Sequence, residues 1–140
     1  MFAMDLADIP LFAMLRGRMG YLSEKQKLIA QNVANADTPG FAARDLRAPD
    51  DFAHAMMQQS QGVGMMRTST AHMAIQPQRA ANYASMTSPD SETTLDGNSV
   101  VVEEQMLRMA ESRMAHDAAI GFYQKSLNML RMAARKPGAA

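Results

Sequence analysis

Apolar residues recur at alternating steps of three and four near both ends of this 140-residue chain, and this spacing constrains the fold more than any other feature. The N-terminal seam consists of Phe12, Leu15, Met19, Leu22, Gln26, Ile29 and Val33. The C-terminal seam consists of Val102, Met106, Met109, Arg113, His116, Ile120, Tyr123, Leu127, Leu130 and Ala134. Each pattern predicts a long amphipathic helix with a few polar interruptions, so we expect a mainly α protein.

The limits of the first helix are marked by prolines. Pro10 suits a first helical turn, where its missing N–H costs nothing, and Asp8 is placed to cap that turn. The helix is expected to stop near Asn35, because the pair Pro39 and Gly40 cannot continue it.

The limits of the second helix are marked by a turn and by charge. Residues 95–98 read as a turn, after which Asn98 or Ser99 is expected to cap the helix. Glutamates lie in its first turns and basic residues in its last, which is the order that the helix dipole favours. Pro137 is expected to end it.

The middle of the chain has a different composition from the two ends. Residues 47–94 are rich in Gly, Pro, Gln, Ser and Thr, so we expect an irregular, loop-rich insert. Within it we predict a short helix at 51–59, an extended segment or hairpin arm at 68–75, and a flexible surface loop at 87–94. Residues 1–46 and 95–140 would then form one discontinuous helical domain.

The composition excludes several classes of protein. Fourteen basic and fourteen acidic residues leave no net charge, which argues against a nucleic-acid binder. The absence of Cys excludes disulfides, thiolate metal sites and a Cys nucleophile. No stretch approaches the ~18 apolar residues of a membrane span, and no cleavable secretion signal is recognisable, so we expect a chain that does not span membranes.

An enzyme is also not indicated. The three histidines lie far apart in the sequence, and no nucleophile can be paired with a base. We therefore predict no catalytic, cofactor-binding or metal-binding residues. The 15 methionines are interpreted as packing filler of the helical seams, because Met adapts to irregular gaps.

The most informative stretch is 31–41, at the end of the first helix. Asn32 and Asn35 lie three residues apart on one helical face, and their amides suit a tightly packed polar contact with a neighbouring chain. Residues 37–40 then predict a sharp turn in which Gly40 takes a positive φ, and Phe41 leaves it extended. A plain helix end followed by a turn would explain the same residues.

This stretch, from Asn32 to Phe41, closely resembles the signature of bacterial flagellar rod, hook and related axial proteins. Its continuation through residues 43–46 is most similar to the proximal rod members of the flagellar basal-body rod protein family. Residues 96–100, 103–106 and 109–111 look like the C-terminal region of that family. The resemblance covers about 9–46 and 95–134. Phe41 replaces the more usual Tyr, and Met stands at many positions where relatives carry Leu or Ile.

The resemblance implies a fold and a function. The two helices would pair as an antiparallel coiled-coil-like domain, and the chain would polymerise into the proximal rod, the drive shaft that crosses the periplasm. Export without a cleavable signal through the flagellar type III apparatus would be expected. Expected partners are other copies, neighbouring rod proteins, and the MS-ring and export-gate region, with no small-molecule substrate. The predicted subunit-packing motif is Asn32, Asn35, Asp37, Thr38, Pro39, Gly40 and Phe41.

A second class of function stays open at this point. A helical chaperone or adaptor of a type III secretion system would also explain two amphipathic helices, although it would leave the turn motif at 35–41 without a purpose.

Overall fold

Two long helices and one small strand pair make up the part of the chain that the computed structural model describes, residues 9–47 and 83–135. The elements are α1 (Pro10–Ala34), β1 (Arg44–Leu46), β2 (Ser85–Thr87) and α3 (Val102–Ala134). The predicted helix at 51–59 and the extended segment at 68–75 lie outside the described residues, as does Pro137. No helix in the described ranges is both long and apolar enough to cross a membrane.

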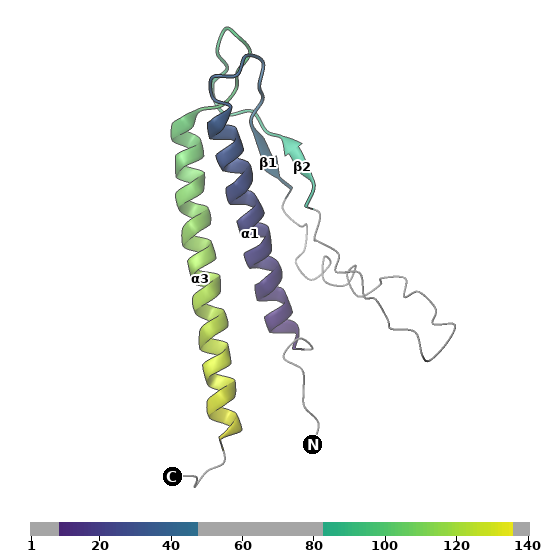
Figure 1. Cartoon of the computed structure of the whole chain (residues 1–140), viewed down its shortest axis with the longest axis vertical. Coiled ribbons are helices and arrows are strands. Elements are labelled where there is room, and N and C mark those ends of the chain that lie inside the picture. Colours follow the sequence, from purple (N-terminus) through teal and green to yellow (C-terminus); the bar gives the residue numbers. More distant parts are fainter. Residues whose placement is uncertain (1–8, 48–82, 136–140) are drawn as a thin grey trace, which may run out of the picture.

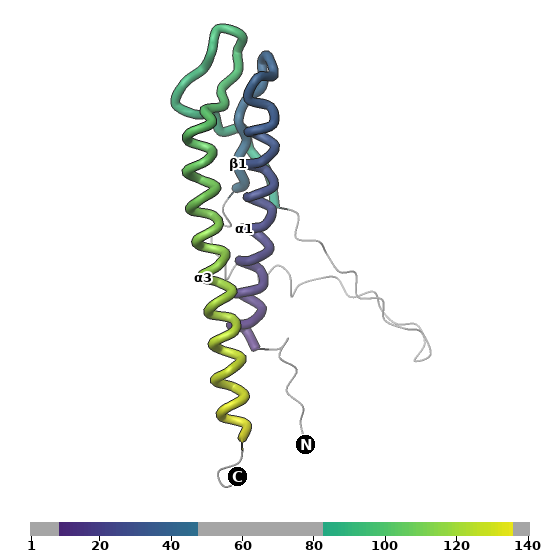
Figure 2. The backbone as a smooth tube through the Cα atoms, turned by 60° about the vertical axis from the view of Figure 1, so that its left-hand side comes forward, coloured from purple at the N-terminus to yellow at the C-terminus, as the bar shows by residue number. Residues whose placement is uncertain are grey.

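The helices α1 and α3 run antiparallel and lie side by side over most of the length of α1 (Figures 1 and 2). The mainly α fold with two paired terminal helices is therefore confirmed. The chain turns at the same end of the molecule after α1 and before α3, so two segments far apart in the sequence meet there.

The first helix follows its predicted limits closely. Pro10 occupies the first helical turn, and Asn35 is the C-cap residue. The N-cap position belongs to Ile9, whose side chain makes no capping hydrogen bond, rather than to Asp8, which lies outside the described residues.

The predicted cap of the second helix is wrong. The N-cap residue of α3 is Val101, and neither Asn98 nor Ser99 caps the helix. Both side chains are buried and used elsewhere: the Asn98 amide binds the end of α1, and the Ser99 hydroxyl accepts a hydrogen bond from the backbone of Ala43. The predicted charge order is confirmed, with two glutamates in the first turn of α3 and Arg131 in the last.

The predicted seam of α1 lies on its packing face, which also includes Tyr21 and Leu28. Phe12, Leu22 and Ile29 are buried, and the remaining apolar members, Leu15, Met19 and Val33, are half-buried. Phe12 packs edge-on against Tyr123 of α3, with ring centroids 5.2 Å apart. The main apolar cluster lies further along α1 and consists of Tyr21, Leu22, Leu28 and Leu46, flanked by Tyr83 and Ala115.

The predicted seam of α3 is wrong at several positions. Its buried residues are Gln105, Ser112 and Ala119, each one residue before a predicted seam position. The predicted members divide by exposure: Met109, His116, Ile120, Tyr123 and Leu127 are half-buried, whereas Val102, Met106, Arg113, Leu130 and Ala134 are exposed. The helix is rotated because Gln105 is held by a buried polar network, and because the small side chains of Ser112 and Ala119 suit close helix packing.

The strands form a short antiparallel pair beside α1, in which Asp45 lies opposite Met86. Two further backbone hydrogen bonds extend it, from Arg47 to Ala84 and from Ser88 to Ala43, both 2.8 Å. Only the side chain of Leu46 is buried within the pair. The segment 87–94 is largely exposed, as expected for a surface loop, but Asp90 within it is buried.

Candidate subunit-packing site

The predicted turn after α1 is present. The amide of Phe41 donates to the carbonyl of Thr38 at 3.2 Å, which closes a four-residue turn around Pro39 and Gly40. Gly40 has a φ of +72°, the left-handed conformation that glycine adopts without a steric penalty. The positive φ predicted for Gly40 is therefore confirmed.

A second turn, just before α3, interlocks with the first. Gly97, with a φ of +84°, lies so close that a Cβ atom on it would sit 3.4 Å from the Cα atom of Gly40. The amide of Gly40 donates to the carbonyl of Asp96 at 2.9 Å, and the amide of Ser99 donates to the carbonyl of Phe41 at 3.0 Å. We call residues 36–41 and 94–98 together the tip.

Asn98 holds the two halves of the tip together. Its buried side-chain amide donates to the carbonyl oxygens of Asn35 at 2.9 Å and of Thr38 at 2.7 Å, which are backbone acceptors just beyond the last turn of α1. Its Oδ1 atom accepts a hydrogen bond from the amide of Val100. Sequence reasoning missed this role and took Asn98 for a cap of its own helix. The adjacent Gly97 was the available signal, since it marks a tight turn that another backbone can approach.

Asn32 lies inside the chain, not on its surface. Its Nδ2 atom donates to the carbonyl of Arg44 at 2.7 Å and to Oε1 of Gln105 at 3.0 Å, while its Oδ1 atom accepts from the amide of Arg44 at 3.1 Å. The side chain therefore pairs with β1 as a neighbouring strand would, and it is fully buried. The interpretation of Asn32 as a contact for a neighbouring chain is corrected, because its amide is occupied within its own chain.

Asn35 takes the opposite orientation. Its Nδ2 atom donates to the carbonyl of Gln31 at 2.8 Å, and its Oδ1 atom accepts from the hydroxyl of Thr38 at 3.2 Å. The two asparagines, which were predicted to act together, therefore have different roles. The side chain of Asn32 binds the backbone of β1, whereas that of Asn35 bonds within the turn that follows α1.

Asp90 and Gln105 complete a buried polar network that sequence reasoning missed. Nε2 of Gln105 donates to both carboxylate oxygens of Asp90, at 3.1 and 2.9 Å. Asp90 also accepts from the amide of Val101 at 2.8 Å and pairs with Arg108 at 3.1 Å. Asp90 thereby accepts a hydrogen bond from a backbone amide at the start of α3, where no local side chain caps the helix. No buried side-chain N or O atom among the described residues lacks a partner.

The outer surface of the tip is exposed. Asp37, Thr38 and Pro39 are exposed from the first turn, and Leu95 and Asp96 from the second, whereas Phe41 is half-buried. The hydroxyl of Thr94 donates to Asp96, and this hydrogen bond, assisted by the backbone amide of Asn98, lowers the pKa of the Asp96 carboxyl. The tip thus presents a mixed surface, in which the apolar side chains of Pro39 and Leu95 lie among polar ones.

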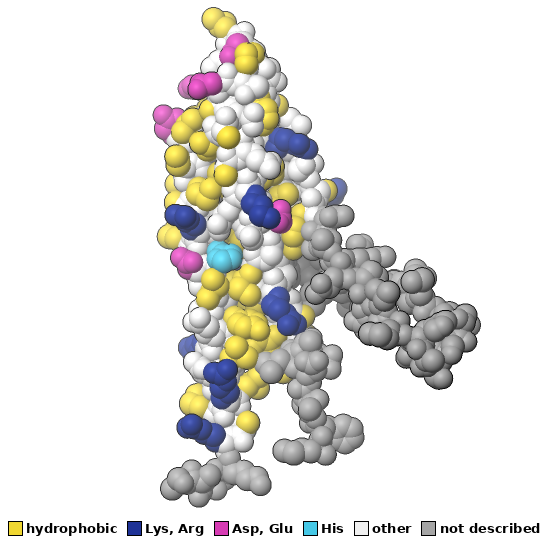
Figure 3. Space-filling view, viewed as in Figure 1, with side chains coloured by type: hydrophobic (Ala, Val, Ile, Leu, Met, Phe, Trp, Pro, Cys, Tyr) yellow, Lys and Arg dark blue, Asp and Glu magenta, His cyan; other side chains and the backbone are white. Residues whose placement is uncertain are grey.

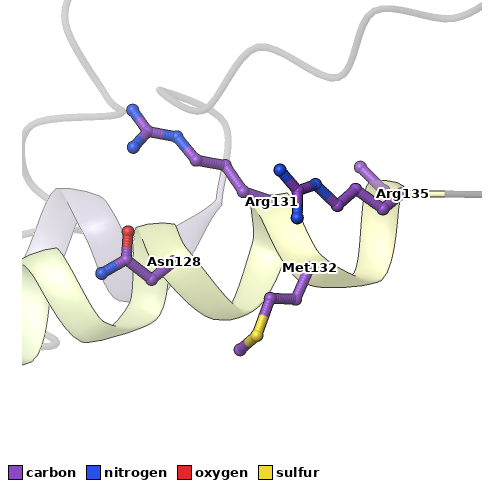
Figure 4. A pocket seen from close by; sticks show the side chains of 5 residues that line it. Asn128, Arg131, Met132 and Arg135 are labelled. Atoms are coloured by element: carbon purple, nitrogen blue, oxygen red, sulfur yellow. The ribbon is translucent and has the colours of Figure 1, made fainter. Parts of the chain in front are cut away.

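The described residues contain a surface hollow but no cluster of metal-binding side chains. No three His, Cys, Asp or Glu side chains gather in this part of the chain so as to hold a metal ion. A shallow hollow lies on the last turns of α3, where Asn128, Arg131, Met132 and Arg135 splay outward from a single helix (Figure 4). A hollow made by one helix supplies no enclosed volume for a substrate.

Comparisons with known proteins show which family the sequence resembles. The sequence model of a family described as flagella basal body rod protein matches residues 15–41, which span most of α1 and the first turn of the tip. The segment that ends in the first turn of the tip is thus similar to proteins of the flagellar basal body rod class.

Individual relatives narrow the class. The chain is 31% identical to the flagellar basal body rod protein FlgB of Agrobacterium fabrum over 135 residues, which cover 94% of this chain and 98% of the relative. It is 31% identical to FlgB of Aeromonas hydrophila (77% of this chain, 80% of the relative) and 27% identical to FlgB of Bacillus subtilis (76% and 79%). The chain belongs to the FlgB family of flagellar basal body rod proteins.

Proposed function

We propose that the chain is a structural subunit of the bacterial flagellar basal body that polymerises with other copies and with neighbouring rod proteins into the proximal rod. The observation that carries this proposal is the interlocked tip: the segment matched by the rod family, 15–41, supplies one of its two turns and leaves Asp37, Thr38 and Pro39 exposed for contacts. The chain acts as a mechanical element and carries out no chemistry.

The thin core supports assembly. Two paired helices bury few large apolar side chains, and domains of this size are only marginally stable. Large apolar residues remain exposed along α3, among them Leu107, Met114 and Phe122. Burial of such side chains between copies would stabilise the folded chain by mass action, so that folding and assembly are coupled.

The location follows from the function. The subunit would lie in the periplasmic part of the basal body, after export without a cleavable signal, with the MS-ring and export-gate region at one end of the rod. The exposed members of the tip, Asp37, Thr38, Pro39 and Gly40, would contact the adjacent subunit.

Deletion and replacement of the gene test the proposal. Cells lacking the chain should be non-motile, with basal bodies that contain rings but no rod, and the wild-type gene should restore both. Gly40→Val should fail to restore motility, because it forbids the positive φ of the turn. Gly121→Ala, at an open position of α3, should restore it fully.

Two outcomes would contradict the proposal. One is a normal rod in the deletion strain. The other is a chain that stays in the cytoplasm in a discrete complex with an exported protein, which would instead indicate a secretion chaperone or adaptor.

A further inference from the structure

Outside its buried positions, α3 carries a second set of apolar residues that remain exposed. Leu107 and Met114 are seven residues apart, as are Phe122 and Met129, and side chains at this spacing lie on one side of a helix. Leu107, Met114 and Phe122 are 62%, 68% and 63% exposed, and Met129 is half exposed. We call these four residues the outer stripe.

The acidic residues of α3 all lie in its first half. Its first half, residues 102–117, contains four carboxylates and two arginines, whereas its second half together with the C-cap Arg135, residues 118–135, contains three basic residues and no carboxylate. Figure 3 shows the division, with magenta side chains along the upper part of the helix and blue ones at its lower end. Glu103, Glu111, Lys125 and Arg131 are exposed, so their charges are available to a partner.

The second half of α3 also extends beyond α1. The α1 helix begins at Pro10, close to the contact between Phe12 and Tyr123, and α3 continues to Ala134 (Figure 1). Every residue from 128 to 135 is exposed, including Met129, Met132 and the C-cap residue Arg135. Among the described residues, nothing covers this basic and apolar end.

We propose that the outer stripe joins copies of this chain head to tail, with the basic second half of α3 in one copy packed in parallel against the acidic first half of α3 in the next. The inference rests on the proposed function, since it names the partner and the orientation of a contact within the rod. Lys125 of one copy then lies beside Glu103 of the other, and Met129 beside Leu107. Both pairings require a shift of about 22 residues, which is ~33 Å at 1.5 Å per residue.

Charge alone would also permit an antiparallel pair, but symmetry separates the two arrangements. An antiparallel pair uses the same surface of both copies and closes as a dimer. The parallel, shifted contact uses two different surfaces of each copy and leaves one of each free, so it repeats without closing. Only the second arrangement extends a polymer, and it buries the exposed end of α3 in every copy except the last.

Engineered disulfides in the full-length chain test the orientation, because the natural sequence contains no Cys. The double variant Leu107→Cys/Met129→Cys is oxidised at high protein concentration and separated on a non-reducing gel. The proposal predicts a ladder of covalent multimers. The matched control, Met114→Cys/Phe122→Cys, alters residues of similar exposure that do not meet in the shifted arrangement, and it should remain monomeric.

A charge exchange tests the pairing independently. In the Leu107→Cys/Met129→Cys background, Lys125→Glu should lower the multimer yield about threefold at low salt, the effect of an exposed ion pair, and added Glu103→Lys should restore it. Circular dichroism checks that each variant keeps its helices.

The outcomes separate this proposal from the proposed function. A ladder with the expected control and charge response supports the head-to-tail contact. Covalent dimers without higher multimers, cross-linking of the control pair, or monomers alone would overturn it. A variant that forms no ladder yet still supports rods in cells overturns the contact and leaves the rod function intact.

Discussion

The amide of Asn32 donates to Oε1 of Gln105 at 3.0 Å, and both side chains are completely buried between α1 and α3. This contact joins residues 73 positions apart and lies within a network that also holds β1 and Asp90. A polar pair at this depth fixes one rotation of α3 against α1, because every other rotation would bury these amides without partners.

Replacement of Gln105 by Leu should lower the free energy of unfolding by about 2 kcal/mol, because Asp90 and Asn32 each lose a hydrogen-bond partner in a buried site. Urea unfolding followed by circular dichroism measures the change. Met106→Leu, at the adjacent exposed position, should change stability by less than ~0.5 kcal/mol. Equal effects of the two substitutions would show that the network does not stabilise the helix pair.

Phe12→Ala should cost about 3 kcal/mol, since it removes a ring that is 2% exposed together with its edge contact to Tyr123. Leu11→Ala, the neighbouring exposed residue, should cost far less. Hydrogen exchange should show that the loss of protection in the Phe12 variant is greatest around Phe12 and Tyr123. Uniform loss over both helices would contradict a local contact.

Replacement of Gly97 and of Gly121 by alanine should have opposite effects on stability. Gly97→Ala should cost about 1–2 kcal/mol, because a residue with a Cβ atom is strained at a φ of +84°. Gly121→Ala should gain roughly 0.5–1 kcal/mol, since it lies in α3 with open space around it. Thermal unfolding of both variants provides the test, and a stabilised Gly97 variant would contradict the interlocked tip.

Stability should fall at alkaline pH through two tyrosines. Burial raises the pKa of Tyr21, as does the charge of Asp45, and burial with the charge of Glu24 raises the pKa of Tyr83. The folded state therefore keeps the phenol protons longer than the unfolded state, so the contribution is complete below pH ~10 and is lost as pH rises through the folded pKa values.

Urea midpoints at pH 9 and pH 11 measure this effect. The variant Tyr21→Phe/Tyr83→Phe separates the contribution of the two tyrosines from every other pH-dependent change. The variant should show a smaller loss of stability between the two pH values than the natural chain. An identical loss in both proteins would contradict the raised pKa values.

The sequence was sufficient for some features and insufficient for others. The α1 helix and its seam were predictable, because apolar side chains such as Phe12, Leu22 and Ile29 make its contacts. The face of α3 was not, because it packs through Gln105, Ser112 and Ala119, which a hydrophobic pattern does not detect. Large apolar residues that are exposed on α3, including Met106 and Leu107, also shift the seam predicted from the sequence away from the true packing face.

The candidate subunit-packing site also contains features that were predictable from the sequence and features that were not. The turn at Gly40 was predictable from local chemistry, since Pro followed by Gly specifies a positive φ. The roles of Asn32 and Asn98 were not, because their partners are backbone atoms on other segments of the chain. A rule based on spacing placed Asn32 and Asn35 on one face, and only the tertiary structure shows that one points inward and the other toward the turn.

Cryo-electron microscopy of basal bodies purified from cells that produce this chain tests the central claim most directly. The account predicts density for the α1–α3 pair, with its interlocked tip, repeated helically in the proximal part of the rod. A rod whose density excludes this helix pair, with the chain recovered instead in a cytoplasmic complex, would contradict it.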